Sequence, residues 1–434
     1  MAAVTVFCKQ ESPRFRYVLN WVLRDVLHIT YQLTDDESEV VGMPFFISYG
    51  RAFTNALSIP DSGLIWEEAI KEQSIETGVW KTIPTLFQDE ESQMTLPFDF
   101  FGAVFYLISR YEEYHPEQLD KHERYLHTNS MLFKNGWLQR PLIDEWIYEL
   151  YLILQANNIP AQLSPFHYRP TYDIDMAYSY KHKGVRRNIG GFIRDFLKGD
   201  IAAVKERKDV LLSNKLDPFD AFVWMKQLHS ENRVKPIYFI LASLETTEYD
   251  KNISPESEAM QKLIARLSKD GQIGMHPSYY SYKEEIFDDE QHILQQIVGY
   301  PINHSRQHYI KMAIPDTYRR LIKKHIRHDY SMGYGTALGF RAATGRSFYW
   351  YDVEKEEQTE LRVYPFCFMD STVLFNEDYS PEKAFAELKK MTKIARHTHS
   401  SLITVFHNFS LGNVKSWRAW RDKYELFVRE ASKN

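Results

Sequence analysis

Cysteine is scarce in this chain: its 434 residues include two, Cys8 and Cys367. They provide neither a disulfide framework nor the spacing of a cysteine-ligated metal site, so we expect both to be buried. No run of about 18 uninterrupted apolar residues occurs, and the amino terminus lacks a basic segment followed by a long apolar one. The sequence therefore predicts neither a signal peptide nor a membrane span, and it favours a soluble, cytoplasmic protein.

Strong charge and phosphate-binding motifs are also missing. The formal net charge is −5, and no basic stripe interleaved with aromatic residues is present, which argues against nucleic acid as a partner. Neither GxGxxG nor GxxxxGK[ST] follows an expected strand, so nucleotide phosphate binding has no local support. Internal repeats and low-complexity tracts are absent as well.

Aromatic residues, in contrast, are abundant and make up 15% of the chain. Large packed cores account for most of them, because aromatic side chains bury much apolar surface. Sugar-binding clefts also use aromatic rings, which stack on pyranose faces. Composition alone leaves both uses open.

The distribution of apolar residues divides the chain near residues 156–168, where Asn157, Asn158 and Pro160 end a helical pattern. Residues 1–160 are expected to form a smaller α/β domain of unknown role, with strands near 4–7, 29–34 and 43–50. From residue 166 to 434, short apolar runs alternate with amphipathic segments. This alternation predicts parallel strands with crossover helices, in either a barrel or a doubly wound sheet.

The chemically reactive residues of the second part follow its expected strands. Those strands lie at 171–175, 237–242, 272–275, 325–330, 363–368 and 402–407. Parallel α/β folds bind ligands at the carboxyl ends of strands. Asp173, Asp175, His276 and His407 lie at such ends; His308 follows the helix after His276, and Arg341 supplies a further cation.

Asp173 and Asp175 are separated by one residue on an expected strand. Strand side chains alternate, so both carboxylates face one way and Ile174 faces the packing behind them. Two adjacent carboxylates are unfavourable unless a cation, a shared proton or a basic partner lies between them. The alternative is a helix-capping or Asx-turn pair with no ligand.

The other candidates also have structural explanations when each is taken alone. His276 could cap a loop, His308 could lie at an exposed helix start, His407 could be a core histidine, and Arg341 could pair with a surface carboxylate. Their succession on consecutive strand–helix units favours a common site. Two imidazoles and one carboxylate give three protein ligands and an open position, typical of catalytic zinc sites. A second carboxylate could then accept a proton, and a separate histidine could donate one.

The same residues resemble the motifs of the polysaccharide deacetylase superfamily over about residues 166–434. Thr171-Tyr-Asp-Ile-Asp175 is similar to the first motif in an Asp-x-Asp variant, and Val405-Phe-His407 resembles the last. Gly339-Phe-Arg341 is similar to the arginine motif. The segments 109–114 and 305–309 look like a divergent bacterial branch of this superfamily. Its members are metal-dependent N- and O-deacetylases of envelope sugars, with a distorted (β/α) barrel, usually of seven strands.

The resemblance implies a role for each candidate residue. Asp175, His276 and His308 would hold a divalent metal, with zinc expected; Asp173 would be the general base, Arg341 would orient Asp173, and His407 would be the general acid. His308 is chosen because Tyr279 and Tyr280 stand where the family's second-motif histidine is expected. Tyr279, Tyr280, Arg306 and Asp370 are expected to contact substrate.

The sequence thus predicts a metal-dependent hydrolase that deacetylates an N- or O-acetylated carbohydrate, on a (β/α)7-type barrel. One alternative is a metal-free carbohydrate-binding protein on the same barrel, favoured by the tyrosines that replace the expected histidine. The other is a hydrolase of a small non-sugar amide that uses Asp173 and His407. The oligomeric state stays open.

Overall fold

The computed structural model describes residues 3–89, 93–213 and 215–433, which form three sheets. The amino-terminal sheet is parallel, with the strand order β2-β1-β3-β4. Its strands are β1 (Val4–Phe7), β2 (Tyr31–Thr34), β3 (Phe46–Tyr49) and β4 (Ala56–Ile59). An antiparallel pair of strands follows this sheet in the sequence: β5 (Thr77–Trp80) and β6 (Ile83–Leu86). All three strands expected in this region are present.

The helices of this region start where the sequence provides caps. The Ser12 side chain accepts a hydrogen bond from the Phe15 N–H, and Pro13 begins the helix, where its missing N–H costs nothing. The helices are α1 (Pro13–Leu19), which continues as a π-helix (Asn20–Val26), α2 (Glu37–Val40), α3 (Phe100–Ile108), α4 (Met131–Lys134) and α5 (Leu142–Ala156). Single turns lie at Leu64–Trp66, Tyr111–Glu113 and His127–Asn129.

The large sheet has nine strands in the order β12-β13-β11-β10-β9-β8-β7-β15-β14. All neighbouring pairs are parallel except β12 and β13, which form an antiparallel hairpin. The strands are β7 (His167–Ile174), β8 (Ile237–Ile240), β9 (Gln272–Met275), β10 (His304–Ser305), β11 (His328–Asp329), β12 (Phe348–Asp352), β13 (Glu357–Val363), β14 (Phe368–Met369) and β15 (Ser401–His407).

The expected distorted (β/α)7-type barrel is found in part: parallel strands alternate with crossover helices, but closure of the barrel is not detected in the part of the chain that the structure describes. Within the described residues, no ladder joins the end strands β12 and β14, because β13 occupies the free edge of β11 and β12 covers β13. The strand expected at 363–368 is also wrong as a single element. It is the end of β13 and the start of β14, with Pro365 between them, and proline interrupts a sheet ladder.

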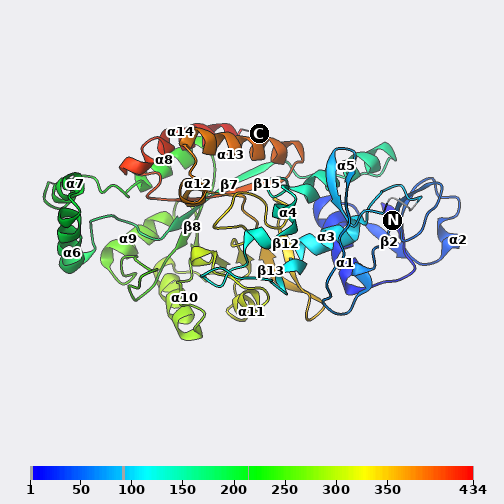
Figure 1. Cartoon of the computed structure of the whole chain (residues 1–434), viewed down its shortest axis with the longest axis horizontal. Helices are drawn as coiled ribbons and strands as arrows, with labels where there is room; N and C mark the ends of the chain where they lie inside the picture. Colours follow the sequence, from blue (N-terminus) through cyan, green and yellow to red (C-terminus); the bar gives the residue numbers. More distant parts are fainter. Residues whose placement is uncertain (1–2, 90–92, 214, 434) are drawn as a thin grey trace.

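The crossover helices lie around this sheet. In Figure 1, α8, α13 and α14 lie above β7 and β15, α9 lies beside β8, and α10 and α11 lie at the bottom of the view. These helices are α8 (Phe222–Asn232), α9 (Glu258–Leu267), α10 (Glu284–Val298), α11 (Asp316–Lys323), α12 (Asp370–Phe375), α13 (Pro381–His397) and α14 (Trp420–Ala431). Two more, α6 (Gly184–Leu197) and α7 (Ile201–Leu212), stand apart at one end. No helix in the described ranges combines the length and apolar character that crossing a membrane requires.

Residues on both sides of the expected boundary at 156–168 belong to one continuous apolar cluster, from Val4 to Ala431. A buried charge network joins the same two regions. Glu113 accepts hydrogen bonds from Arg110 Nε at 2.7 Å and from Arg341 Nε at 2.8 Å, and Arg341 also donates to the Gly333 carbonyl. The prediction that Arg341 orients Asp173 is therefore wrong, because the Arg341 guanidinium forms its ion pair with Glu113.

Removing Glu113 leaves two buried guanidinium groups without their shared carboxylate. We expect Glu113→Ala to lower the free energy of unfolding by about 3–5 kcal/mol, the range for breaking one partner out of a buried ion pair. Urea denaturation followed by circular dichroism measures it. Glu117→Ala is the matched control, since the Glu117 side chain is 77% exposed and should change stability by less than about 0.5 kcal/mol. Equal stability of the two variants would contradict a structural role for the network.

Candidate metal centre

The site lies at the carboxyl ends of adjacent strands of the large sheet. Asp173 is on β7 and Asp175 follows it, His276 follows β9, His308 follows β10, and His407 ends β15. Asp173 pairs in register with His407 on the neighbouring strand. Ile174 is fully buried behind the two carboxylates, as the alternation of strand side chains predicts. Segments far apart in sequence therefore meet at one edge of the sheet.

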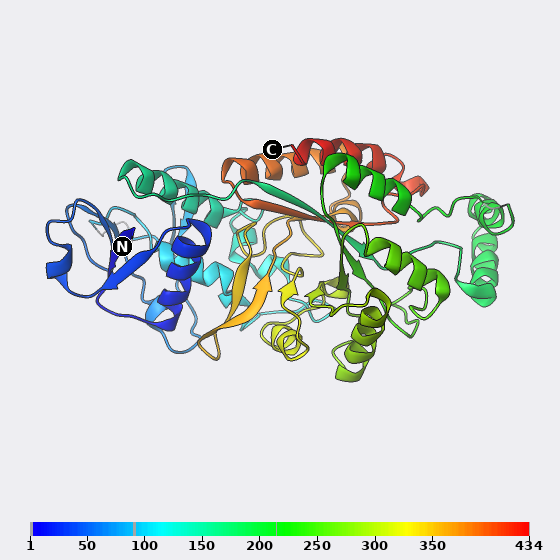
Figure 2. The same cartoon turned by 180° about the vertical axis from the view of Figure 1, so that it is seen from behind.

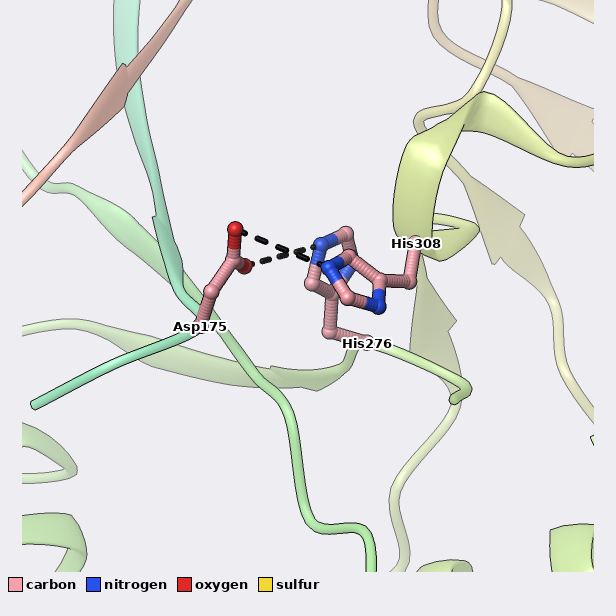
Figure 3. A group of neighbouring side chains, drawn as sticks. All are labelled: Asp175, His276 and His308. Carbon is pink, nitrogen blue, oxygen red and sulfur yellow. Dashed lines mark ion pairs between the residues drawn. The ribbon is translucent and has the colours of Figure 1, made fainter. Parts of the chain in front are cut away.

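Asp175, His276 and His308 point toward one another (Figure 3). Asp175 Oδ1 lies 3.2 Å from His276 Nε2, and Asp175 Oδ2 lies 3.7 Å from His308 Nε2. One ligand atom from each residue lies within 4.8 Å of the others. Both histidines are buried, the Asp175 side chain is 18% exposed, and all three residues line one cavity.

Each imidazole is held by its other nitrogen. His276 Nδ1 donates a hydrogen bond to the Arg306 carbonyl, and His308 Nδ1 lies 2.9 Å from Asp250 Oδ1. An acceptor behind Nδ1 fixes the tautomer and leaves Nε2 free for a ligand, as is usual around metal-binding histidines. Asp250 is itself held by the Tyr279 N–H and the Thr247 hydroxyl.

The residues fit a tetrahedral metal ion. Zinc binds nitrogen and oxygen at about 2.0–2.2 Å, so neighbouring ligand atoms lie roughly 3.3 Å apart. The two shortest separations, 3.2 and 3.7 Å, lie close to this value. Asp175 Oδ1 is buried and accepts no hydrogen bond from the described residues. With His276 protonated on Nδ1, two electron-pair donors face each other there, and a cation between them would remove the repulsion.

The electrostatics of the group point the same way. Burial alone would raise the pKa of Asp175, but His308, His276 and His407 hold the pKa well below its usual value. Burial alone would lower the pKa of His308, but the carboxylates of Asp175 and Asp250 raise it to about 9. The cavity therefore stabilises positive charge beside Asp175, which either protons or a metal ion can provide.

Asp173 lies beside this group and is held by an arginine. Asp173 Oδ1 accepts a hydrogen bond from Arg306 Nη1 at 2.8 Å, and its Oδ2 lies 3.7 Å from His276 Nε2. Arg306 is fully buried and also donates to the Tyr330 carbonyl. The expectation that Arg306 contacts substrate is therefore wrong: Arg306 holds Asp173, the contact expected of Arg341.

His407 also lies beside Asp175, with its Nε2 3.5 Å from Asp175 Oδ2. Its Nδ1 lies 2.6 Å from Asp370 Oδ1, and its backbone N–H donates to Asp370 Oδ2. Burial alone would lower the pKa of His407, but Asp370, Asp175 and Asp173 raise it to about 10. Asp370 is fully buried, so the expectation that it contacts substrate is wrong. It orients the His407 imidazole and raises the pKa of that ring.

A cavity of about 780 Å³ opens above these side chains. Its wall includes Tyr249, Tyr309 and Phe409, and also the amino-terminal loop 120–127. In that loop, Arg124 donates to the Tyr309 carbonyl. Tyr279 and Tyr280 do not line this cavity. They line an adjoining one of about 580 Å³, which shares Tyr249 and His308 with the first.

Two parts of the site escaped the sequence analysis. Asp250 lies ten residues beyond the end of β8, too far from the strand to be read as a strand-end residue. The sequence offers one indication of its role: it is a carboxylate in a loop that follows a parallel strand. The loop 120–127 belongs to the region whose role was unknown. The cavity wall beside this loop contains strained backbone: Tyr309 and Ile310 have positive φ angles of 59° and 53°. Such a conformation is rare for a β-branched residue and is concentrated at functional sites.

Comparisons with known proteins cover the two regions differently. A family of unknown function, DUF7033, matches residues 4–159. No curated protein matches the chain. Similar solved structures include an allantoinase, Puue (11% identity, 62% of this chain and 85% of that one, TM-score 0.40). Others are a "probable polysaccharide deacetylase" from Pseudomonas aeruginosa PAO1 (12%, 61% and 84%, 0.39) and a polysaccharide deacetylase from Bacillus cereus (9%, 61% and 88%, 0.29).

The carboxylate behind His308 provides a test of the metal centre. We expect Asp250→Asn to weaken zinc binding by about 10–100-fold, because a neutral amide in place of the carboxylate acceptor behind a ligating imidazole lowers the basicity of the ring and holds its orientation less firmly. Competition with a chelating dye measures the Kd. Asp288→Asn is the control, since that carboxylate is exposed on α10 and pairs with Lys324. An unchanged Kd in Asp250→Asn would argue against His308 as a ligand.

Proposed function

We propose that this chain is a metal-dependent hydrolase that removes an acetyl group from an N- or O-acetylated carbohydrate. The observation that carries the proposal is the meeting of three groups in one cavity: Asp175 with His276 and His308, Asp173 on Arg306, and His407 on Asp370. Two of the chain segments involved are those that resemble the deacetylase motifs. The alternative of a metal-free binding protein rests on a missing histidine; the position of His308 beside Asp175 and His276 supports the metal-dependent hydrolase instead.

Asp175, His276 and His308 would hold the metal ion. When bound, a divalent cation with an open position polarises an acyl carbonyl and acidifies water. The contacts behind the two imidazoles fit this role, because they present Nε2 of both rings to the same point. Zinc suits a set of two imidazoles and one carboxylate.

Asp173 would act as the general base. Arg306 holds Oδ1 of Asp173 and leaves Oδ2 toward the reacting side of the cavity. A proton from the attacking water passes to Asp173 as the new C–O bond forms. The hydrogen bond from the Arg306 guanidinium fixes the direction of the Asp173 carboxylate.

His407 would act as the general acid. Its raised pKa, about 10, keeps the imidazole protonated at neutral pH. Its Nδ1–H donates to Asp370, so the second proton lies on Nε2 and faces the cavity. That proton passes to the leaving amine or alkoxide as the acyl bond breaks, which yields acetate and the free sugar group.

The cavity wall suits a sugar. Tyr249, Tyr309 and Phe409 present aromatic rings at the wall, and Lys121, Lys251 and Arg124 add hydrogen-bond donors. Rings that pack on pyranose faces, with donors around them, bind carbohydrate with its many acceptor oxygens. The adjoining cavity with Tyr279 and Tyr280 would extend the surface along a longer chain.

His407→Gln removes the proposed proton donor and keeps a side chain of similar length. We expect kcat for acetate release from N-acetylated chitooligosaccharides or O-acetylated xylan to fall by about 10²–10⁴-fold. Bound zinc, measured by mass spectrometry, should not change. His292→Gln, on the exposed face of α10, should leave both quantities as in the wild type.

Three results would contradict the proposal. One is acetate release that survives complete chelation of divalent metals. Another is a normal kcat in His407→Gln. The third is full metal occupancy in the wild type with no release of acetate from either acetylated sugar.

A further inference from the structure

The helical hairpin α6–α7 stands apart from the rest of the molecule. It lies at the far left of Figure 1 and the far right of Figure 2, beyond α8 and α9 in both views. It interrupts the connection between β7 and β8, directly after the segment that carries Asp175. No expectation from sequence accounts for it.

The polarity of α6 is reversed with respect to a normal surface helix. Its one buried residue is Asp195, whose carboxylate binds Arg207 of α7 at 2.6 Å. Arg207 also donates to Asn188 at 3.1 Å. At Gly191 a Cβ would lie 2.6 Å from the Arg207 side chain, so the glycine permits this close approach. The two helices are thus held together by a polar inner face.

The apolar face of α6 is exposed instead. Six large apolar side chains recur at intervals of three, four and one, which places them on one stripe of the helix. They are Val185 (74% exposed), Ile189 (55%), Phe192 (44%), Ile193 (52%), Phe196 (59%) and Leu197 (79%). Ile201 and Leu212 of α7 are 61% and 77% exposed. A contiguous exposed apolar patch of this kind marks an interaction surface.

The charge of the hairpin is opposite to that of the chain as a whole. Residues 181–216 contain ten Lys and Arg and four Asp and Glu, a formal charge of +6, whereas the whole chain carries −5. Several of these cations, including Arg186, Arg194 and Lys198, are exposed beside the apolar stripe. The surface thus combines an apolar face with a cationic border.

We infer that the α6–α7 hairpin docks on an anionic lipid surface. The apolar stripe would enter the interface between head groups and acyl chains, and the Lys and Arg side chains would contact the head groups. A second copy of this chain is the weaker occupant. Self-association through the same face would bring two segments of charge +6 together, and like charges across an interface oppose binding.

The hairpin is tied to the proposed metal centre. Arg187 of α6 donates to the carbonyls of Asn252 at 3.0 Å and Lys251 at 2.8 Å. These two residues follow Asp250, the carboxylate behind His308, and Lys251 lines the cavity. Docking would therefore hold the cavity at a fixed distance from the lipid surface, whatever reaction the cavity performs.

Sedimentation with vesicles tests the inference. The full chain should bind vesicles of phosphatidylcholine with phosphatidylglycerol and should bind pure phosphatidylcholine weakly. Raising salt from about 0.1 M to about 0.5 M should release it, because the cationic contribution is screened. The double variant Ile193→Asp with Phe196→Asp should bind at least about tenfold more weakly, since each buried apolar side chain contributes roughly a factor of ten.

Matched controls separate docking from misfolding. Both substituted residues are exposed, so the double variant should keep the wild-type melting temperature. Leu426→Asp places the same change on an exposed residue of α14 (63% exposed) and should leave vesicle binding unchanged. In Phe192→Trp, the emission of the new indole should shift to the blue when anionic vesicles are added, because the side chain leaves water.

The inference is overturned by any of three results. The first is no binding to anionic vesicles. The second is equal binding of the wild type and the double variant. The third is a light-scattering result, without lipid, in which the wild type is a dimer and the double variant is a monomer. That result would assign the stripe to a second copy of the chain. Because these readouts need no turnover, they stand or fall separately from the hydrolase activity.

Discussion

The carboxylate of Asp175 is the group around which the site is arranged. Three imidazoles, from β9, β10 and β15, direct Nε2 toward it at distances between 3.2 and 3.7 Å. A carboxylate at this depth is costly unless positive charge surrounds it. The parallel register of the strands supplies that charge from segments that are distant in sequence, so the sheet and the site stabilise each other.

Each of the three imidazoles is fixed from behind by a different acceptor. His276 is held by a backbone carbonyl, His308 by Asp250 and His407 by Asp370. This difference separates their chemistry. The carbonyl behind His276 fixes the Nδ1–H tautomer and leaves Nε2 for a ligand, whereas the buried carboxylate of Asp370 raises the pKa of His407 and favours its protonated ring. The Asp250 carboxylate is an intermediate case, because its negative charge is compatible with His308 either as a neutral metal ligand or as a protonated imidazole.

The sequence was most informative where local rules decide the structure. Alternation along β7 placed Asp173 and Asp175 together, and apolar runs located β8, β9 and β15. It failed where distant residues compete. Arg306 and Arg341 were indistinguishable by pattern, and only the fold brings Glu113 to Arg341 and Asp173 to Arg306. β10 is two residues long, too short to leave a pattern, and the reversed helix α6 looks like an ordinary surface helix in sequence. Sheet closure depends on the β12–β13 hairpin, whose pairing no local rule specifies.

The loop 120–127 gives the cavity a wall that comes from outside the large sheet. Its His122 lies 3.0 Å from the Tyr279 hydroxyl, and Arg124 binds the backbone at Tyr309, but none of its residues contacts Asp173, Asp175 or His407 through a hydrogen bond or ion pair in the described structure. The shape of the entrance is therefore encoded separately from the reacting groups. A change in the side chains of this loop would therefore alter the wall and the entrance of the cavity while leaving the contacts among the strand-end residues in place.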